Sequence, residues 1–443
     1  MPMEPRQASN RRVTGSRTLM RAAAAIALCT GTLLGLAACG GGGGGGSSAA
    51  LPVAVVPSSS PVSSAPAATS LNSMTLTVSG GTDSSAINLP QVSVQICAPG
   101  TSTCQTINNV LVDTGSTGIR IAAAALGSSL LAALPQETVS GTPLDACQQF
   151  LDGYTWGTMR VADVTLGPKS AASQPLQIVG DPSAGTAPGT CTDNGTLDAE
   201  NTPADLGTNG IIGVAAFLQD CGAACAQKAV SATYYTCPSG GQCQSTAVPI
   251  AMQSQNVVAN FAQDNNGVVL SLPAISSAGQ GVTVGTLYFG VGTQANNAMT
   301  GATVLQTNPR TLRVSASYKN ASFPDSFLDS GSNFFFLNDS TIAQCPKDGA
   351  FVGFYCPANP LDLSAGFATA TGSTLNESFA VASAQSLFTN NPGVVAVNNI
   401  AAATTSSAID FGLPFFYGKL VAVLNEGQSA LGQQGPFTAL APR

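Results

Sequence analysis

The segments Val110-Leu-Val-Asp-Thr-Gly-Ser116 and Ser326-Phe-Leu-Asp-Ser-Gly-Ser332 are two versions of one motif within a chain of 443 residues. They align at a constant offset of 216 residues, and apolar positions on both sides of them repeat at the same offset. These repeated pairs are Ile107 with Phe323, Leu111 with Phe327, Val112 with Leu328, Ile119 with Phe335, and Ile121 with Leu337. The repetition indicates an internal duplication.

Each motif places one aspartate between an apolar run and a glycine. The apolar run predicts a buried strand that leads up to Asp113 or Asp329, and the glycine lets the backbone turn sharply, so that the carboxylate stands at a cleft. Two facing loops would bring the two carboxyls close enough to share one proton, because both cannot ionise at contact distance. The sequence therefore predicts Asp113 and Asp329 as catalytic residues. The loop residues expected to support them are Thr114, Gly115, Ser116, Ser330, Gly331 and Ser332.

The composition restricts the chemistry that is available. The chain has no histidine, and only 8% of its residues are charged, against about 25% in ordinary globular chains. Without an imidazole there is no Ser-His-Asp triad, no Cys-His dyad and no His-based zinc helix. Any catalysis must therefore use carboxylates, hydroxyls, amines or a metal site without histidine.

The charge balance argues against nucleic acid as a partner. The formal net charge is −7, but residues 1–39 contain five arginines and one acidic residue. The remaining chain therefore has ten basic against 21 acidic groups, a net charge near −11. Such a surface would be repelled by phosphate backbones.

The N-terminal segment is typical of an export signal. Its five arginines precede an apolar stretch, residues 22–36, that is too short for a spanning helix and ends in Leu36-Ala-Ala-Cys39. This ending resembles a bacterial lipobox, so residues 1–39 are predicted to be a lipoprotein signal peptide with lipid attached at Cys39. The alternative is an ordinary secretory signal in which Cys39 is incidental. Because Gly40 follows the cysteine, the resemblance to lipoprotein sorting rules favours the outer membrane.

Residues 40–72 are predicted to be a tether, because a run of seven glycines is followed by a tract rich in Ser, Pro and Ala without apolar periodicity. About 33 flexible residues have an r.m.s. span of about 30 Å. That span is enough to hold a folded body away from an anchoring membrane.

Cysteine usage also indicates an oxidising compartment. Beyond Cys29 and Cys39 ten cysteines remain, and eight of them form four pairs that are close in sequence. The expected disulfides are Cys97 with Cys104, Cys221 with Cys225, Cys237 with Cys243, and Cys345 with Cys356, which leaves Cys147 with Cys191. Spacing alone leaves the connectivity open, and a zinc site formed by Cys221, Cys225, Cys237 and Cys243 is the alternative.

Beyond the tether the signals for strands dominate. Residues 74–78, 92–96, 268–272 and 312–316 alternate or cluster apolar residues between turn-forming Gly, Pro, Asn and Asp. The best helical candidates are residues 121–134 and 255–264. The sequence therefore predicts a mostly β body.

The paired Asp loops resemble those of the pepsin-like aspartic proteases, and further segments match that family in order. Residues 154–159 look like its flap hairpin, and residues 209–213 look like the segment that packs behind the first catalytic loop. Residues 285–290 resemble the opening strand of its second lobe, and residues 410–416 resemble its C-terminal segment. The chain is also similar to a group of bacterial lipoproteins of unassigned function.

The resemblance implies a two-lobed pepsin-like double β-barrel, with an N-terminal lobe over residues 73–275 and a C-terminal lobe over residues 276–443. It implies a monomeric endopeptidase that hydrolyses peptide bonds with an Asp-activated water, without cofactor or metal. Tyr154 and Trp156 would lie on a flap over the peptide, although both could instead be half-buried hairpin aromatics. The run Phe334-Phe-Phe336 could narrow the cleft.

Three alternatives remain at this stage. The chain could be a catalytically inactive pepsin-like lipoprotein with a binding or structural role in the envelope. It could be a glycosidase, whose two carboxyls would stand about 5 Å or more apart instead of sharing a proton. Finally, Asp113 and Asp329 could simply cap turns, as Asp before Gly often does.

Overall fold

The structure is a computed structural model that describes residues 71–150 and 153–443. The predicted signal peptide, the lipidation site Cys39 and the tether as far as residue 70 lie outside the described residues. Within the part of the chain that is described, no helix has the length and apolarity needed to cross a membrane.

The described chain is mostly β, as predicted, and nearly all strands belong to two sheets. The 17-stranded sheet contains β1 (Ser73–Ser79), β2 (Leu89–Cys97), β3 (Cys104–Asp113), β4 (Thr117–Ala122), β5 (Thr138–Val139), β6 (Thr142–Gln149), β7 (Gly153–Leu166), β8 (Lys169–Val179), β9 (Asp198–Ala199), β10 (Gly210–Val214), β11 (Tyr234–Thr236), β12 (Gln244–Ser245), β13 (Gly267–Ser271), β14 (Thr283–Phe289), β15 (Thr303–Val304), β23 (Lys419–Leu424) and β26 (Phe437–Pro442). The 7-stranded sheet contains β16 (Val314–Tyr318), β17 (Ala321–Leu328), β18 (Phe335–Leu337), β19 (Leu361–Ala368), β20 (Thr374–Val381), β21 (Ala401–Ala403) and β22 (Asp410–Phe411). A small hairpin is formed by β24 (Ser429–Ala430) and β25 (Gln433–Gln434).

Helices are short in the described residues: α1 (Ser128–Ala133), α2 (Pro203–Leu206), α3 (Ala223–Gln227) and α4 (Ala384–Asn390). The expected helix at 121–134 is wrong in its first half, because Ile121 pairs with Ile178 of β8 and only the last turns are helical. The expected helix at 255–264 is reduced to the 3-10 turn Val257–Asn260. Strand pairing and burial thus override the helix propensity of the alanine-rich run.

The internal duplication appears in the strand pairing. In the first half β10 runs parallel to β3 and antiparallel to β4, and β4 runs parallel to β8. In the second half β22 runs parallel to β17 and antiparallel to β18, and β18 runs parallel to β21. The registers correspond as well, since Ile212 faces Val112 and Ile119 while Phe411 faces Leu328 and Phe335. The same four-stranded unit therefore occurs twice.

The two units share one apolar core. Its buried side chains include Val112, Ile119 and Ile212 from the first unit, and Leu328, Phe335 and Phe411 from the second. Burying such side chains is the main favourable contribution to folding, at about 25 cal/mol for each Å² of apolar surface removed from water. Most of the apolar residues that repeat at the offset of 216 are thus buried in this core, and they anchor the strands that carry the two Asp loops.

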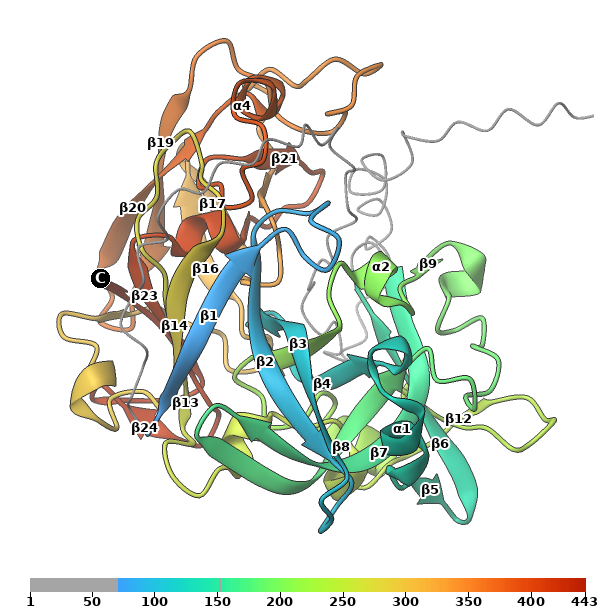
Figure 1. Cartoon of the computed structure of the whole chain (residues 1–443). Coiled ribbons are helices and arrows are strands. Elements are labelled where there is room, and N and C mark those ends of the chain that lie inside the picture. Colours follow the sequence, from blue (N-terminus) through green and yellow to red (C-terminus); the bar gives the residue numbers. More distant parts are fainter. Residues whose placement is uncertain (1–70, 151–152) are drawn as a thin grey trace, which may run out of the picture.

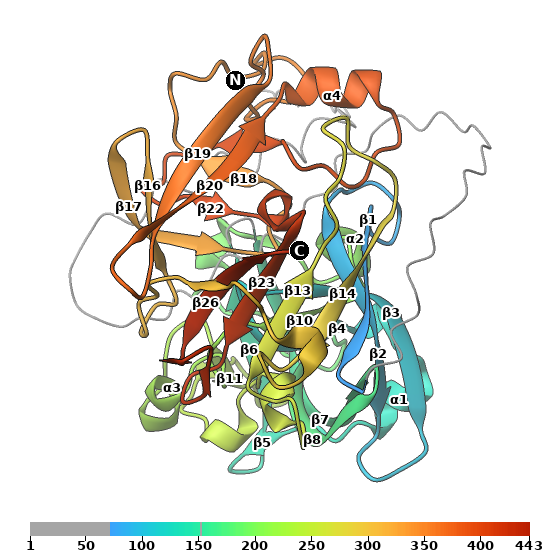
Figure 2. The same ribbon diagram turned by 90° about the vertical axis from the view of Figure 1, so that its left-hand side faces the viewer.

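The two halves of the chain are joined by strands that pair across the sequence. In Figure 2, β16 to β20 lie in the upper part and β5, β7 and β8 lie at the bottom, with β13, β14, β23 and β26 at heights between them. β13 pairs with both β14 and β23, and β1 pairs with β14 (Figure 1). The expected lobe boundary at residues 275 and 276 falls between β13 and β14, and the division into lobes stays a prediction.

All five predicted disulfides are confirmed: Cys97–Cys104, Cys147–Cys191, Cys221–Cys225, Cys237–Cys243 and Cys345–Cys356. The zinc alternative is wrong, because its four cysteines are bonded in pairs and a disulfide sulfur is not a thiolate ligand. Asp145 lies close to Cys237 and Cys243, but a single carboxylate beside a disulfide is not a metal site.

We predict that removing the Cys147–Cys191 disulfide destabilises the fold more than removing Cys221–Cys225. The first bond closes a loop of 44 residues and the second a loop of four. Chain entropy then gives costs of about 4 and about 2 kcal/mol, respectively. Urea unfolding of the two Cys→Ala double variants checks this difference, and equal costs would contradict it.

Candidate active site

The two motif carboxylates meet at the junction of the duplicated units. Asp113 ends β3 and Asp329 directly follows β17, so each strand delivers one carboxyl. Both side chains are fully buried, with 0% exposure, and their carboxyl groups are in hydrogen-bond contact. The structure thus brings together the two aspartates that the sequence predicted to pair.

Each carboxyl is oriented by its own loop in the same way. The Gly115 N–H donates to Oδ1 of Asp113 over 2.7 Å, and the Ser116 hydroxyl donates to Oδ2. At the second loop the Gly331 N–H donates to Oδ1 of Asp329 over 2.8 Å, and the Ser332 hydroxyl lies 3.0 Å from Oδ2. Both carboxyl planes are therefore fixed before any ligand binds.

The two loops are locked to each other by reciprocal hydrogen bonds. The N–H of Thr114 donates to the Ser330 hydroxyl, which donates to Val112 O. In return the Ser330 N–H donates to the Thr114 hydroxyl over 2.9 Å, and that hydroxyl donates to Leu328 O. All of these groups are buried, so an unmade bond would leave a desolvated polar atom. The hydroxyls that the sequence singled out thus act across the two loops.

The two motif glycines serve a purpose that differs from the sequence expectation. Neither Gly115 nor Gly331 has a positive φ, so neither is needed for a left-handed turn. A Cβ on Gly115 would instead lie 2.7 Å from the Asp329 carboxyl, and one on Gly331 would lie 2.6 Å from Oδ1 of Asp113. Glycine is required because each loop backbone packs directly against the opposite carboxyl.

The contact makes the pair electrostatically unlike two separate carboxylates. Burial, followed by the charges of Asp113 and Asp410 and the hydrogen bond to Asp113, raises the pKa of Asp329 well above its ordinary value. Two carboxyls in contact that share a proton behave as one titrating unit. Two carboxyls joined by a hydrogen bond are closer than the roughly 5 Å or more expected of glycosidase carboxyls, so the glycosidase alternative is not supported.

A third buried carboxyl, which the sequence did not indicate as a site residue, joins the pair. Asp410 of β22 is 3% exposed, and its Oδ2 lies 2.6 Å from the hydroxyl of Ser332. Burial raises the pKa of Asp410 well above its ordinary value, against the opposing effects of Ser332 and Arg313. Its position in the segment 410–416 could have signalled it, because an aspartate there interrupts an apolar strand.

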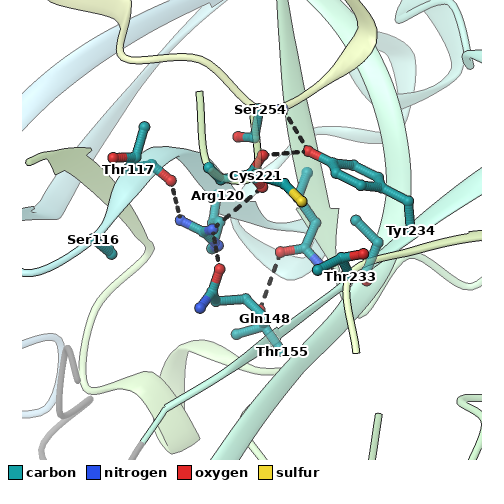
Figure 3. Close-up of polar contacts among 12 residues, drawn as sticks. Ser116, Thr117, Arg120, Gln148, Thr155, Cys221, Thr233, Tyr234 and Ser254 are labelled. Atoms are coloured by element: carbon teal, nitrogen blue, oxygen red, sulfur yellow. Dashed lines mark hydrogen bonds and ion pairs between the residues drawn. The ribbon is translucent and has the colours of Figure 1, made fainter. Parts of the chain in front are cut away.

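Arg120 forms a second polar cluster beside the first Asp loop, shown in Figure 3. This guanidinium is 1% exposed, donates to Thr117 O and to Oε1 of Gln148, and lies 4.0 Å from Asp220. Burial raises the pKa of Asp220 to about 6, although Arg120 and the Tyr234 hydroxyl oppose that shift. The cluster links β4 to the hairpin of β6 and β7 and to the segment that contains Asp220.

The predicted flap aromatics face away from this cluster. Tyr154 and Trp156 pack among Cys147, Cys191 and Tyr235, and Trp156 donates to Gly185 O over 2.6 Å. Because alternate residues of a strand point to opposite faces, the neighbours of Cys147 and Trp156, namely Gln148 and Thr155, occupy the other face.

On that other face Gln148 contacts Arg120, and the ring of Phe150 lies 6.0 Å from the Arg120 guanidinium carbon. The structure therefore does not bring Tyr154 or Trp156 to the carboxylates. Gln148 and Phe150 are the hairpin residues that sequence reasoning missed.

The phenylalanine run after the second loop is used in packing. Phe335 belongs to the main core, while Phe334 and Phe336 are half-buried beside Phe354. The ring centres of Phe334 and Phe354 lie 4.8 Å apart with an edge-to-face orientation. These side chains do not line the cavity at the first Asp loop.

A cavity of about 70 Å³ adjoins the first Asp loop. Its walls include residues 114–117, Gln148 and Asp220, and, from the second half, Arg313 and Phe327. The Arg313 guanidinium lies 4.1 Å from the centre of the Phe327 ring. A second cavity, of about 540 Å³, shares Thr307 and Arg313 with the first.

Comparison with known proteins places the chain in a family. The model of a family described as a protein of unknown function (DUF3443) matches residues 68–440, a range that contains both Asp loops. The chain belongs to this family. No curated protein sequence matches the chain. Among solved structures, the aspartic proteinase from Irpex lacteus is similar with a TM-score of 0.46 and 15% sequence identity, over 84% of this chain and 97% of that one.

We predict that Thr114→Val destabilises the fold by about 2 to 4 kcal/mol, because it leaves both Ser330 N–H and Leu328 O buried without a partner. Ser93→Ala, which removes an exposed hydroxyl bonded to Asn108, is the matched control and should cost less than about 0.5 kcal/mol. Urea unfolding at pH 7 measures both free-energy changes, and similar values would contradict a stabilising role for the reciprocal hydrogen bonds between the two loops.

We also predict that Arg120→Met costs about 3 kcal/mol, because it leaves Asp220, whose side chain is only 15% exposed, without its cation. The loss should be larger at pH 8 than at pH 5. Loss of the cation raises the folded-state pKa of Asp220 above its value of about 6 in the wild-type chain. The folded variant then binds this proton more tightly than the unfolded chain does, and that contribution to stability is lost as the pH rises. Unfolding measured at both pH values checks this, and a deficit independent of pH would contradict it.

Proposed function

We propose that this chain is a secreted, lipid-anchored aspartic endopeptidase. The observation that carries the proposal is the contact of two fully buried carboxyl groups, Asp113 and Asp329, held by two loops with mirrored hydrogen bonds. A turn cap needs only one carboxylate accepting from its own loop. A role as turn caps does not explain why the carboxyls of two repeated units contact each other.

In the proposed reaction the pair carries one proton. The ionised carboxyl takes a proton from a water molecule as that water attacks the peptide carbonyl, and the protonated carboxyl donates a hydrogen bond to the developing oxyanion. The raised pKa of Asp329 supports its role as the protonated member near neutral pH. No covalent intermediate is required, because water is the nucleophile.

The proposed substrate is an extended peptide or protein that enters between the two halves of the chain. The cavity at residues 114–117 supports this, because its walls come from both halves and adjoin the Asp113 loop. The pepsin-like two-lobed arrangement remains part of the proposal. The repetition of the four-stranded unit in the two halves of the chain supports it.

The proposed location follows from the N-terminal sequence and the disulfides. Five disulfides are typical of a protein in an oxidising compartment, which supports export from the cytoplasm. Lipid at Cys39 and the tether to residue 72 would hold the body near the outer membrane.

One observation favours a second candidate, an inactive pepsin-like protein with a binding or structural role in the envelope. Asp113 and Asp329 have no exposed surface, so neither water nor a peptide reaches them in this conformation. Activity requires a movement that opens the site. An inactive protein would need none.

We predict that the full chain, purified in detergent, cleaves an unfolded protein substrate between pH 3 and pH 8, and that a statine-type inhibitor blocks cleavage. Asp113→Asn should reduce kcat/KM by at least about 10⁴-fold, because the pair loses its base. Asp325→Asn, a change at an exposed carboxylate of β17, is the matched control and should retain activity. No cleavage by the folded wild-type chain at any pH would favour the inactive candidate.

A further inference from the structure

The duplicated units differ at one position that bears directly on the site. Ile211 faces Leu111 in the first unit, and Asp410 faces Phe327 in the second, which is the corresponding position. The first unit thus has an apolar side chain where the second has a carboxyl. Burying a carboxyl at a position that can hold isoleucine costs free energy. Its presence there calls for a role that an apolar residue could not serve.

The contacts of Asp410 connect it to the catalytic pair through one hydroxyl. The Oγ atom of Ser332 lies 2.6 Å from Oδ2 of Asp410 and 3.0 Å from Oδ2 of Asp329. A serine hydroxyl has a single proton, so it can donate to only one of these two oxygens. The other short contact is a hydrogen bond only if that carboxyl is protonated and donates to Ser332. The geometry therefore accommodates a proton on Asp410 or on Asp329.

The second oxygen of Asp410 supports the same conclusion. Oδ1 is buried and has no hydrogen-bond partner among the described residues. An ionised carboxylate with one oxygen unsatisfied in the interior is costly, whereas a neutral carboxyl leaves only an uncharged carbonyl oxygen without a donor. Asp410 is thus better suited to the protonated state, with its proton directed to Ser332.

We propose that Asp410 is a third carboxyl of the active site, which holds a proton and exchanges it with Asp329 through Ser332. In the exchange, Oδ2 of Asp410 gives its proton to Ser332 Oγ, and the original Ser332 proton moves to Oδ2 of Asp329. Asp410 is left as the carboxylate and Asp329 is protonated, so the number of protons is unchanged. The inference rests on the proposed function, and Asp410 acts as a positioning residue because it reaches the pair only through Ser332.

The charged groups around Asp410 agree with this assignment. From the first Asp loop the charge of Asp113 raises the pKa of Asp410, and from the segment before β16 the charge of Arg313 lowers it, although burial is the largest effect. The other carboxylate of β17, Asp325, is exposed, and β18 carries no titratable side chain. Asp410 in turn raises the pKa of Asp329. The third carboxyl therefore extends the pH range in which the pair keeps its proton.

The first test is the pH dependence of kcat/KM for the full chain. Asp410→Asn and Asp410→Ile, the latter restoring the residue of the first unit, should both shift the alkaline limb to lower pH by about one unit. Activity above that limb then falls about tenfold. In the Ser332→Ala background, where the connecting hydroxyl is absent, Asp410→Asn should shift the alkaline limb by less than it does in the wild-type chain. Asp325→Asn should leave the profile unchanged, and an unshifted alkaline limb in both Asp410 variants would overturn the proposal.

The second test needs no catalytic activity. A carboxyl whose folded-state pKa is raised binds its proton more tightly in the folded chain, so its contribution is favourable at low pH and is lost as pH rises above the unfolded value of about 3.9. The stability of wild type relative to Asp410→Asn should therefore fall steadily from pH 4 to pH 8 in urea unfolding. A difference independent of pH would overturn the proposal. A pH-dependent difference in a chain that cleaves nothing would support the third carboxyl while rejecting the peptidase function.

Discussion

Two carboxyl groups excluded from water and pressed against each other form the constraint on which the remainder of this structure depends. Each would be better solvated alone, and together they repel unless they share a proton. The contact persists because the loops carrying Asp113 and Asp329 are bonded to each other through Thr114 and Ser330. Those bonds in turn require both strands to end at the same point, which the shared core of the two units ensures.

The duplication explains how the site is symmetric in its backbone and asymmetric in its chemistry. Strand order and register are repeated, so corresponding residues meet equivalent neighbours. The side chains at two corresponding positions differ: Arg120 matches Phe336, and Ile211 matches Asp410. One unit therefore has a buried cation beside its Asp loop and the other a buried carboxyl. Two carboxyls that act as base and as acid require such a difference, because identical surroundings would give both the same affinity for protons.

The low charge of the chain is reflected in how its interior is held together. Neutral amides and hydroxyls take the place that ion pairs often have. Asn88, for example, donates to Asn333 O and Val397 O, and accepts from the Val397 N–H and the Tyr417 hydroxyl. Such a residue satisfies its hydrogen bonds without the desolvation cost of a buried charge. Disulfides add covalent stability around the β6 and β7 hairpin and its neighbours.

The sequence by itself determined the features that depend on local pattern. Alternating apolar residues specified strands, the repeated Asp-Thr/Ser-Gly-Ser motif specified two equivalent loops, and close spacing favoured four of the five disulfides. Only the tertiary structure decided what depends on which face of a strand meets which neighbour. The β6 and β7 pairing turned Tyr154 toward the disulfides and Gln148 toward Arg120. The register of β22 on β17 brought Asp410 to Ser332, 78 residues away in the chain, and no spacing rule in the sequence encodes that proximity.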